Sequence, residues 1–309
     1  MHGHVERAFL KALDFTMAAQ LGLPLADGLQ YVTRAYVFER DLVLRCADKR
    51  MRNVVKGVGA GEVQIADARI EPTFAQVPYI IFEHAEGDVR DVVAANIGRF
   101  DEAWALRVLH GVANGLRQLH QEGIAHQDLK PSNVMAFGPV AKVGDLGRAS
   151  SPDGSGMYDG PIIAGDLGYA PPELLYGEFQ PDDRVRRLAC DAYHLGSMAV
   201  FMYTGSGLTP LIEVELAPTF HWRAWPGDFR NALPYVRNAF DYVMTSLEGS
   251  MQSSLGGQVL QTIRELCDPD PLLRGGGAGG APSGRYAMAR YVTRFDLLAR
   301  RVEIAGRAP

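Results

Sequence analysis

The sequence is poor in cysteine and in long hydrophobic runs, and each scarcity excludes a class of protein. Its three cysteines, Cys46, Cys190 and Cys267, lie far apart and form no CxxC pair, so neither a zinc site nor a disulfide framework is indicated. The longest apolar stretch, residues 195–205, is shorter than the roughly 18 residues of a membrane span, and no charged-then-apolar leader opens the chain. We therefore expect a cytoplasmic protein without a membrane partner.

An excess of positive charge is absent as well. The chain has 31 Lys and Arg against 36 Asp and Glu, a formal net charge of −5, which gives no electrostatic reason to expect nucleic acid as a partner. Two short basic runs, residues 48–52 and 184–187, are interpreted as solvated faces. With 309 residues, 47% of them hydrophobic, the chain can bury one large core or two smaller ones.

The order of the expected elements predicts two unequal parts. Residues 7–15 are strand-like, residues 25–50 carry apolar side chains at helical spacing, and residues 54–65 and 77–84 read as two further strands. Helices dominate from residue 88 onward, and a Gly-rich connector precedes the last one. They are expected at residues 101–123, near 183–204 and 255–268, and at 285–304, with the connector at 275–284. Residues 206–250 match no pattern that we can assign. The fold class is therefore α+β, with two lobes of different size.

The stretch GIAHQDLKPSNVM, residues 123–135, concentrates polar side chains in a loop that follows a helix. Asn133, together with Asp145 of the later DLG, supplies the oxygen ligands that Mg²⁺ prefers. Lys130 is a point charge suited to a phosphate, and Asp128 can accept a proton from an incoming hydroxyl group. Any one of these residues is also common in a turn, but the ordered set favours a catalytic function.

This ordered set resembles the eukaryotic-type (Hanks-type) Ser/Thr protein kinase family. Residues 126–133 match the catalytic-loop pattern H-x-D-L-K-P-x-N, residues 145–147 match D-F-G with Leu for Phe, and residues 170–173 match A-P-E. The resemblance implies that Asp191 supports the catalytic loop and that Arg274 pairs with Glu173. It also implies a kinase N-lobe at residues 1–85, a C-lobe at residues 86–309, and ATP and Mg²⁺ as cofactors.

The resemblance also assigns the nucleotide site. AFLKAL matches the strand of the ATP-binding lysine, here Lys11, and YVFERDLVLRC matches the helix that supplies its partner, here Glu39, with Asp41 as the second choice. Residues 83–85 would form the hinge, whose backbone meets the adenine. The cofactor-binding residues implied are Lys11, Glu39, Glu83, Ala85, Asn133 and Asp145. The segment TMAAQLGLPLADG, residues 16–28, would be an inserted loop, and Lys56 is interpreted as solvent-facing. A surface lysine at position 11 and an ordinary helix-surface glutamate at position 39 are the alternatives.

The Gly-rich loop of the family has no counterpart where it should stand. G-x-G-x-x-G should precede Lys11, where only residues 1–10 are available, and GVGAGE at residues 57–62 follows the glutamate helix. A truncated N-lobe without this phosphate-covering hairpin should bind ATP more weakly. It should also expose a sheet edge beside Lys11, where a strand of a partner chain could pair.

Three functions therefore remain open. The first is ATP- and Mg²⁺-dependent transfer of phosphate to Ser/Thr of a protein substrate. The cover over the nucleotide, which the Gly-rich hairpin forms in the family, would then be rebuilt by residues 1–10, by the insertion or by a partner strand. The second is a pseudokinase that acts as a binding module, and the third is a small-molecule kinase. The joint presence of Asp128, Lys130, Asn133 and Asp145 favours chemistry, and KPSN is typical of Ser/Thr kinases.

Two departures from the family pattern affect activity and regulation. Gln127 stands where many regulated kinases have an Arg that pairs with an activation-segment phosphate, which weakens the case for such a switch. Asp166 stands where a Thr is common; its carboxylate could bind Lys130 but would repel Asp128 and so reduce activity. The segment also holds Ser150, Ser151, Ser155 and Tyr158 as candidate phosphorylation sites, although ordinary residues of a flexible loop are the favoured interpretation.

Overall fold

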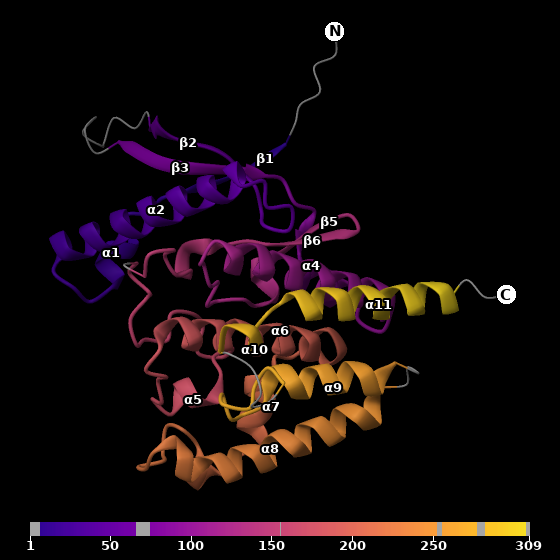
Figure 1. Ribbon diagram of the computed structural model, residues 1–309. Coiled ribbons are helices and arrows are strands. Elements are labelled where there is room, and N and C mark those ends of the chain that lie inside the picture. The colour runs from indigo at the N-terminus through magenta and orange to yellow at the C-terminus, as the bar shows by residue number, and fades with distance from the viewer. Residues whose placement is uncertain (1–6, 66–74, 155, 252–254, 277–281, 307–309) are drawn as a thin grey trace.

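The computed structural model describes residues 7–65, 75–154, 156–251, 255–276 and 282–306. Figure 1 shows a small sheet and a long helix stacked on a larger body of helices. The α+β fold with a small strand-rich part and a large helical part is confirmed. The division between residues 85 and 86 stays a prediction.

The small part is a three-stranded antiparallel sheet packed on one helix. Strands β1 (Ala8–Ala12), β2 (Gly57–Gln64) and β3 (Gln76–Glu83) have the order β1-β3-β2. Helix α2 (Leu25–Asp48) buries an apolar stripe beneath them, and α1 (Met17–Gln20) lies beside its first turn. The two helices meet closely at Gly28, where a Cβ atom would lie 2.4 Å from the carbonyl oxygen of Ala18. The central strand β3 has neighbours on both edges, whereas β1 pairs only with β3 among the described strands.

The large part is organised around two buried helices. Helix α4 (Glu102–Gln121) begins at Asp101, whose carboxylate accepts the Trp104 N–H, as expected of an N-cap. Helix α6 (Asp183–Thr204) is buried along most of its length. The remaining helices surround this pair. They are α3 (Val89–Ala95), α5 (Pro172–Leu175), α7 (Leu208–Glu215), α8 (Phe229–Ser250), α9 (Gly256–Cys267), α10 (Pro282–Arg285) and α11 (Ala289–Ala305).

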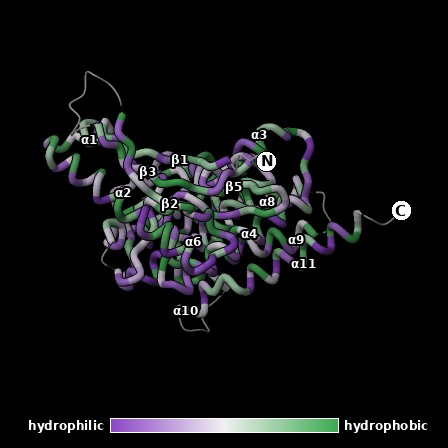
Figure 2. Tube along the Cα trace, turned by 90° about the horizontal axis from the view of Figure 1, so that it is seen from above, coloured by the Kyte–Doolittle hydropathy of each residue, from purple (hydrophilic) through white to green (hydrophobic). Residues whose placement is uncertain are grey.

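A second small sheet carries the loops of the cleft. Strands β4 (Gly87–Asp88), β5 (Val134–Phe137) and β6 (Val140–Val143) form it in that order. Figure 2 looks down on the small part and shows α1 and the C-terminal end of α11 projecting on opposite sides. Within the described residues, no helix is both long and apolar enough to cross a membrane.

Most expected elements are confirmed, and the differences have physical causes. Residues 16–28 are not simply a loop, because they contain α1 and the first turn of α2. Residues 206–250, which no pattern assigned, hold α7 and the 22-residue α8. Pro234 hides the α8 pattern, since proline in a helix usually marks its first turn and here lies inside it. Residues 277–281 of the expected connector lie outside the described residues.

Candidate active site

The catalytic-loop segment is anchored from below by Asp191 on α6. One carboxylate oxygen of Asp191 accepts the His126 N–H at 2.8 Å, and the other accepts the Gln127 N–H at 2.8 Å. The ring of His120 lies 2.7 Å from the same carboxylate. Burial disfavours the charged form of Asp191, but His120, His126 and the loop N–H groups outweigh it and lower the pKa of Asp191 below its usual value. The loop backbone is therefore fixed by a buried, ionised carboxylate.

Asp128, Lys130 and Asn133 converge at the end of this loop. The Asn133 side-chain amide donates to the backbone oxygen of Asp128 at 2.7 Å, and Lys130 Nζ lies 3.5 Å from Asp128 Oδ2. Asp166 joins them, since its carboxylate is 3.2 Å from Lys130 Nζ. Its backbone N–H donates to Asp128 Oδ1 at 2.8 Å. The expected Asp166–Lys130 contact is present, and the Asp166 N–H opposes the expected repulsion of Asp128.

Lys11 connects the strand-rich part to the helical part. Its Nζ lies 2.7 Å from Glu39 Oε1 on α2 and 3.1 Å from Asp145 Oδ1. Burial lowers the pKa of Lys11, but the two carboxylates outweigh it and raise that pKa above the usual value. Burial opposes ionisation of Asp145, but Lys11 outweighs it and holds the pKa of Asp145 below its usual value. Lys11 and Asp145 are therefore charged at neutral pH.

The expected cofactor residues line one cleft of about 410 Å³. All six of them, Lys11, Glu39, Glu83, Ala85, Asn133 and Asp145, contribute to its wall. Sequence reasoning missed the apolar part of the lining, formed by Phe9, Val55, Phe82 and Met135. Of these four, only Phe82 carried a signal in the sequence, because it directly precedes the expected hinge. The Glu83 carboxylate is held by Lys142 at 2.7 Å and also accepts the Lys56 N–H at 2.7 Å, so its side chain is already paired within the protein.

Two alternative residues lie elsewhere. Asp41 pairs with Arg40 at 2.7 Å, whereas the Lys11 pairs are with Glu39 and Asp145. Lys56 is exposed, as the sequence predicted. GVGAGE, residues 57–62, lies within β2 and pairs with β3.

The oxygen atoms at the base of the cleft fit a magnesium ion bound together with phosphate. The amide nitrogen of Asn133 donates to Asp128, which orients its side-chain oxygen as the remaining acceptor. Asp145 supplies an ionised carboxylate. Mg²⁺ usually takes one or two such protein ligands and completes its shell with water and phosphate oxygens. Among the described residues, no cluster of three or more His, Cys, Asp or Glu side chains could hold a metal by itself.

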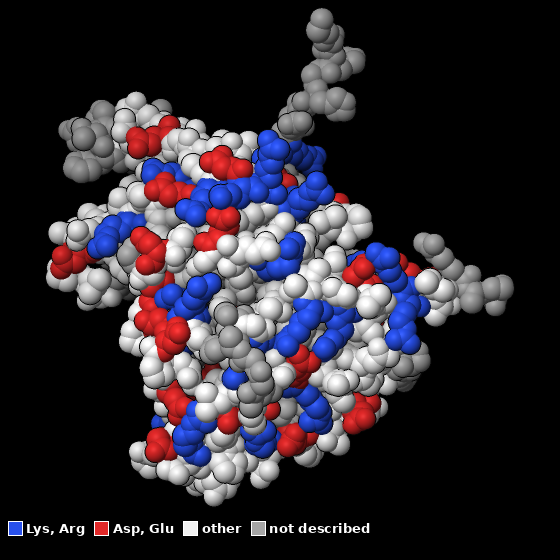
Figure 3. Space-filling model, viewed as in Figure 1, with Lys and Arg blue, Asp and Glu red and all other residues white. Residues whose placement is uncertain are grey.

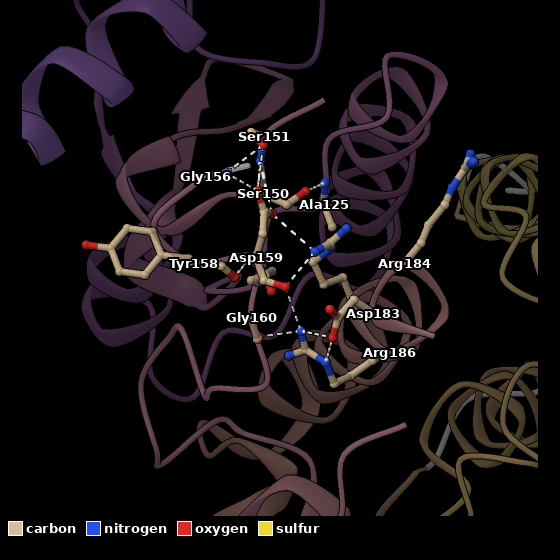
Figure 4. A network of polar contacts seen from close by, with 12 residues as sticks. Ala125, Ser150, Ser151, Gly156, Tyr158, Asp159, Gly160, Asp183, Arg184 and Arg186 are labelled. Carbon is tan, nitrogen blue, oxygen red and sulfur yellow. Dashed lines mark hydrogen bonds and ion pairs between the residues drawn. The ribbon is translucent and has the colours of Figure 1, made fainter. Parts of the chain in front are cut away.

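The activation segment, which runs from the DLG motif to the APPE motif, is held against the large part by a polar network around Asp159 (Figure 4). The buried Asp159 carboxylate accepts the Ser151 N–H at 3.2 Å and the Gly156 N–H at 2.5 Å, and it pairs with Arg187 at 3.2 Å. Arg187 and Arg186 also donate to the backbone oxygen of Asp159, at 2.8 and 3.1 Å. The Asp159 carboxylate of the activation segment thus neutralises the charge of Arg187 on α6.

Gln127 and Tyr158 add further contacts to the same segment. The Gln127 side-chain amide donates to the backbone oxygens of Tyr158 at 3.1 Å and of Arg148 at 3.3 Å. The Tyr158 hydroxyl group lies 3.0 Å from that of Tyr31 on α2 and accepts from Arg148 at 2.9 Å. Ser150, Ser151 and Tyr158 are buried, so these candidate phosphorylation sites are closed in this conformation, and Ser155 lies outside the described residues.

A buried ion pair holds the end of the activation segment. Both oxygens of Glu173 accept from the Arg274 guanidinium group, at 2.6 and 2.7 Å. Arg274 is completely buried and Glu173 is nearly so. The pairing that the sequence resemblance implied is therefore present.

Comparisons with known proteins agree with this geometry. The family model of the protein kinase domain matches residues 50–220, which is more than half of the chain, and the chain therefore belongs to this family. Over 63% of its length the chain is 35% identical to a Wee1-like protein kinase of Oryza sativa subsp. japonica. Over 68% of its length it is 34% identical to the serine/threonine-protein kinase SSN3 of Yarrowia lipolytica. The matches cover 29% and 47% of these relatives, so the chain spans less than half the length of each.

Proposed function

We propose that the chain transfers the γ-phosphoryl group of ATP, with Mg²⁺, to serine or threonine hydroxyl groups of a protein substrate. One observation carries the proposal. The Lys11–Glu39–Asp145 cluster and Asn133 line a single cleft. Asn133 is hydrogen-bonded to Asp128, whose carboxylate lies 3.5 Å from Lys130. A scaffold would need none of these side chains together. The serine/threonine acceptor is favoured by KPSN and by the SSN3 relative.

Each residue has a physical role in this mechanism. Lys11, held by Glu39, would bind the α- and β-phosphates, and Asp128 would orient the acceptor hydroxyl group and take its proton. Lys130 would neutralise the γ-phosphoryl group as it transfers. Asn133 and Asp145 would hold Mg²⁺, which supplies charge neutralisation of the phosphate oxygens when bound. Positioning and charge stabilisation would supply most of the rate.

Phe9 would cover part of the nucleotide site. Its ring lines the cleft with Phe82, at a centroid distance of 6.3 Å, and 57% of its surface is exposed. An adenine bound against the backbone of residues 83–85 would cover this face and stack on the ring. Phe9 would in this way supply part of the cover that the Gly-rich hairpin forms in the family.

A binding function is the second candidate, and one observation favours it. The outer edge of β1 has no partner strand among the described residues, and Phe9 and Leu10 on this strand are exposed. A partner protein could add a strand there. If turnover is weak, the chain would act as a pseudokinase whose partner covers this edge.

Radiolabelled γ-phosphate transfer to a protein mixture, followed by phosphoamino-acid analysis, tests the proposal. We expect label on Ser and Thr with wild type and Mg²⁺, and a loss of about 10²- to 10⁴-fold for Asp128→Asn, because the proton acceptor is removed. Asp41→Asn is the matched control, since Asp41 is exposed and pairs with Arg40. Absence of transfer by wild type, with intact folding, would assign the chain to the binding function instead. Label on a small molecule rather than on protein would contradict the protein acceptor.

A further inference from the structure

A second pocket, of about 400 Å³, lies behind the cleft at the C-terminal end of α2. Residues 50–56, which connect α2 to β2, form one wall, and β6 forms another. Lys and Arg side chains gather on this side of the molecule, between the end of α2 and the strands (Figure 3). Four of them line the pocket: Arg50, Arg52, Lys56 and Lys142. We call this site the basic pocket.

Three of the four cations have no carboxylate partner among the described residues. Lys142 is paired with Glu83, but Arg50, Arg52 and Lys56 take part in none of the ion pairs of the residues that the structure describes. Their neighbours Arg45 and Lys49 behave differently, because both pair with Glu122, at 3.1 and 3.2 Å. Near the end of α2, the cations outside the pocket are therefore paired with a carboxylate, whereas three that line the pocket have no such partner among the described residues.

The backbone at Arg50 is a second, independent observation. Arg50 has φ 53°, in the left-handed region, and its N–H donates to the Ala47 oxygen at 2.9 Å just beyond the end of α2. Glycine or asparagine usually occupies this position because other residues are strained there. An arginine kept in this conformation stores local strain, which is typical of positions retained for a function.

The floor of the basic pocket is apolar. Cys46, Met51, Val54 and Val55 line it, and all four are buried. Asp48, Lys49, Arg50 and Arg52 are exposed, as the sequence predicted for residues 48–52, and the buried floor lies beneath them. A cation rim above an apolar floor suits a ligand that carries its charge at one end and an apolar body at the other.

We propose that the basic pocket binds a small organic phosphate whose apolar or aromatic body lies on this floor. A phosphate monoester carries about −1.5 to −2 charges at pH 7, which three unpaired cations can neutralise. Guanidinium groups bind its oxygens in a fork geometry. The partial negative charge at the end of α2 opposes an anion, but it amounts to about half a unit charge against three cations. A ligand there would contact both β6 and the C-terminal end of α2, and Glu39 lies on this same helix.

Calorimetric titration of the whole chain with phenyl phosphate tests this inference. We expect sub-millimolar affinity for wild type and a loss of at least about tenfold for Arg50→Gly, as for the removal of a charge-assisted hydrogen bond. Glycine adopts the left-handed conformation without strain, so this variant should unfold at the same temperature as wild type or higher, and misfolding cannot explain the loss. Lys49→Gln removes a charge from the adjacent residue outside the pocket and should change the affinity less than about twofold.

Two further probes separate the parts of the site. Inorganic phosphate should bind at least about tenfold more weakly, because it leaves the apolar floor uncovered, and phenol should not bind. Equal affinity of wild type and Arg50→Gly for phenyl phosphate would overturn the proposal, since binding would then lie elsewhere, including in the Lys11 cleft. Absence of binding up to 10 millimolar would overturn it as well. Failure of the phosphotransfer assay would leave this result unaffected, because the pocket shares no charged residue with the proposed active site.

Discussion

The helical side of the cleft and its strand side are stabilised in different ways. On the helical side, Asp191 and Arg274 are completely buried, and each makes several hydrogen bonds that fix a loop. On the strand side, β1 is an edge strand whose Phe9 and Leu10 expose 57% and 52% of their surface. Lys11 connects the two sides through Glu39 and Asp145. Substitutions should therefore destabilise the fold on the helical side and affect mainly ligand binding on the strand side.

The largest effect is expected from Glu173→Gln on the helical side. The substitution keeps the size of the side chain but leaves the buried Arg274 without its counter-charge. Removal of one partner of a buried pair typically costs about 3–5 kcal/mol. Urea denaturation should show this loss in the free energy of unfolding. Glu178→Gln is the control, because Glu178 pairs with the partly exposed Arg230, and a loss below about 1 kcal/mol is expected there. Equal losses of unfolding free energy in the two variants would contradict the view that burial makes the Glu173–Arg274 pair more important than an exposed pair.

Asp159→Asn tests whether the activation segment is positioned by the chain itself. Asparagine keeps the shape but removes the charge that neutralises the buried Arg187. We expect phosphotransfer to fall by about 10- to 100-fold, the equivalent of about 1.4–2.7 kcal/mol, because a charge-assisted contact is lost. Hydrogen exchange in residues 148–160 should increase in the same variant.

The exposed Asp153 provides the control for this prediction, since Asp153→Asn removes an equal charge from the same segment but leaves the Asp159–Arg187 pair in place. Asparagine also keeps an oxygen that can accept from the Ser151 hydroxyl group, as Asp153 does. Phosphatase treatment of the wild type should leave its activity unchanged, since the segment is held by Asp159 and Gln127 rather than by a phosphate. A strict requirement for phosphorylation would contradict this view of the segment.

The sequence predicted the helical side of the site more completely than the strand side. Asp128, Asn133 and Asp145 lie in short, ordered motifs, so their spatial proximity followed from local sequence. The Lys11–Glu39 pair joins residues far apart in the chain, and only the resemblance to a family placed them together. Phe9 could not be assigned to the cleft, because the direction of a side chain on an edge strand depends on its register with β3.

Contacts around the activation segment were beyond sequence reasoning. Asp159 carries no motif, and its importance arises from the meeting of Ser151, Gly156 and Arg187 in space. Helix α8 was missed for a related reason. Its apolar positions, such as Val236, Phe240 and Val243, are buried by packing against α7 and α9, while Pro234 masks the pattern.

His194 should make the helical side sensitive to acid. Burial lowers the pKa of His194 to about 4 from its usual value of 6.5. Below pH 6.5 the unfolded chain binds a proton that the folded chain does not, so stability is lost as the pH falls from 6.5 toward 4. Between pH 7.5 and 5 the loss should be about 2 kcal/mol, measured by urea denaturation. His194→Asn should remove this part of the pH dependence. An unchanged slope in that variant would assign the sensitivity to other groups.

Phe9→Ala should have the smallest effect on stability, and it tests most directly whether the strand side contributes to ATP binding. The exposed ring contributes little to folding, so the free energy of unfolding should change by less than about 0.5 kcal/mol. Loss of base stacking costs about 1–3 kcal/mol, and the dissociation constant for ATP should therefore rise by about tenfold, as measured with a fluorescent nucleotide. Leu10→Ala is the matched control, because Leu10 is similarly exposed on the same strand but does not line the cleft. If both variants weaken ATP binding equally, β1 acts through its backbone position rather than through the Phe9 ring.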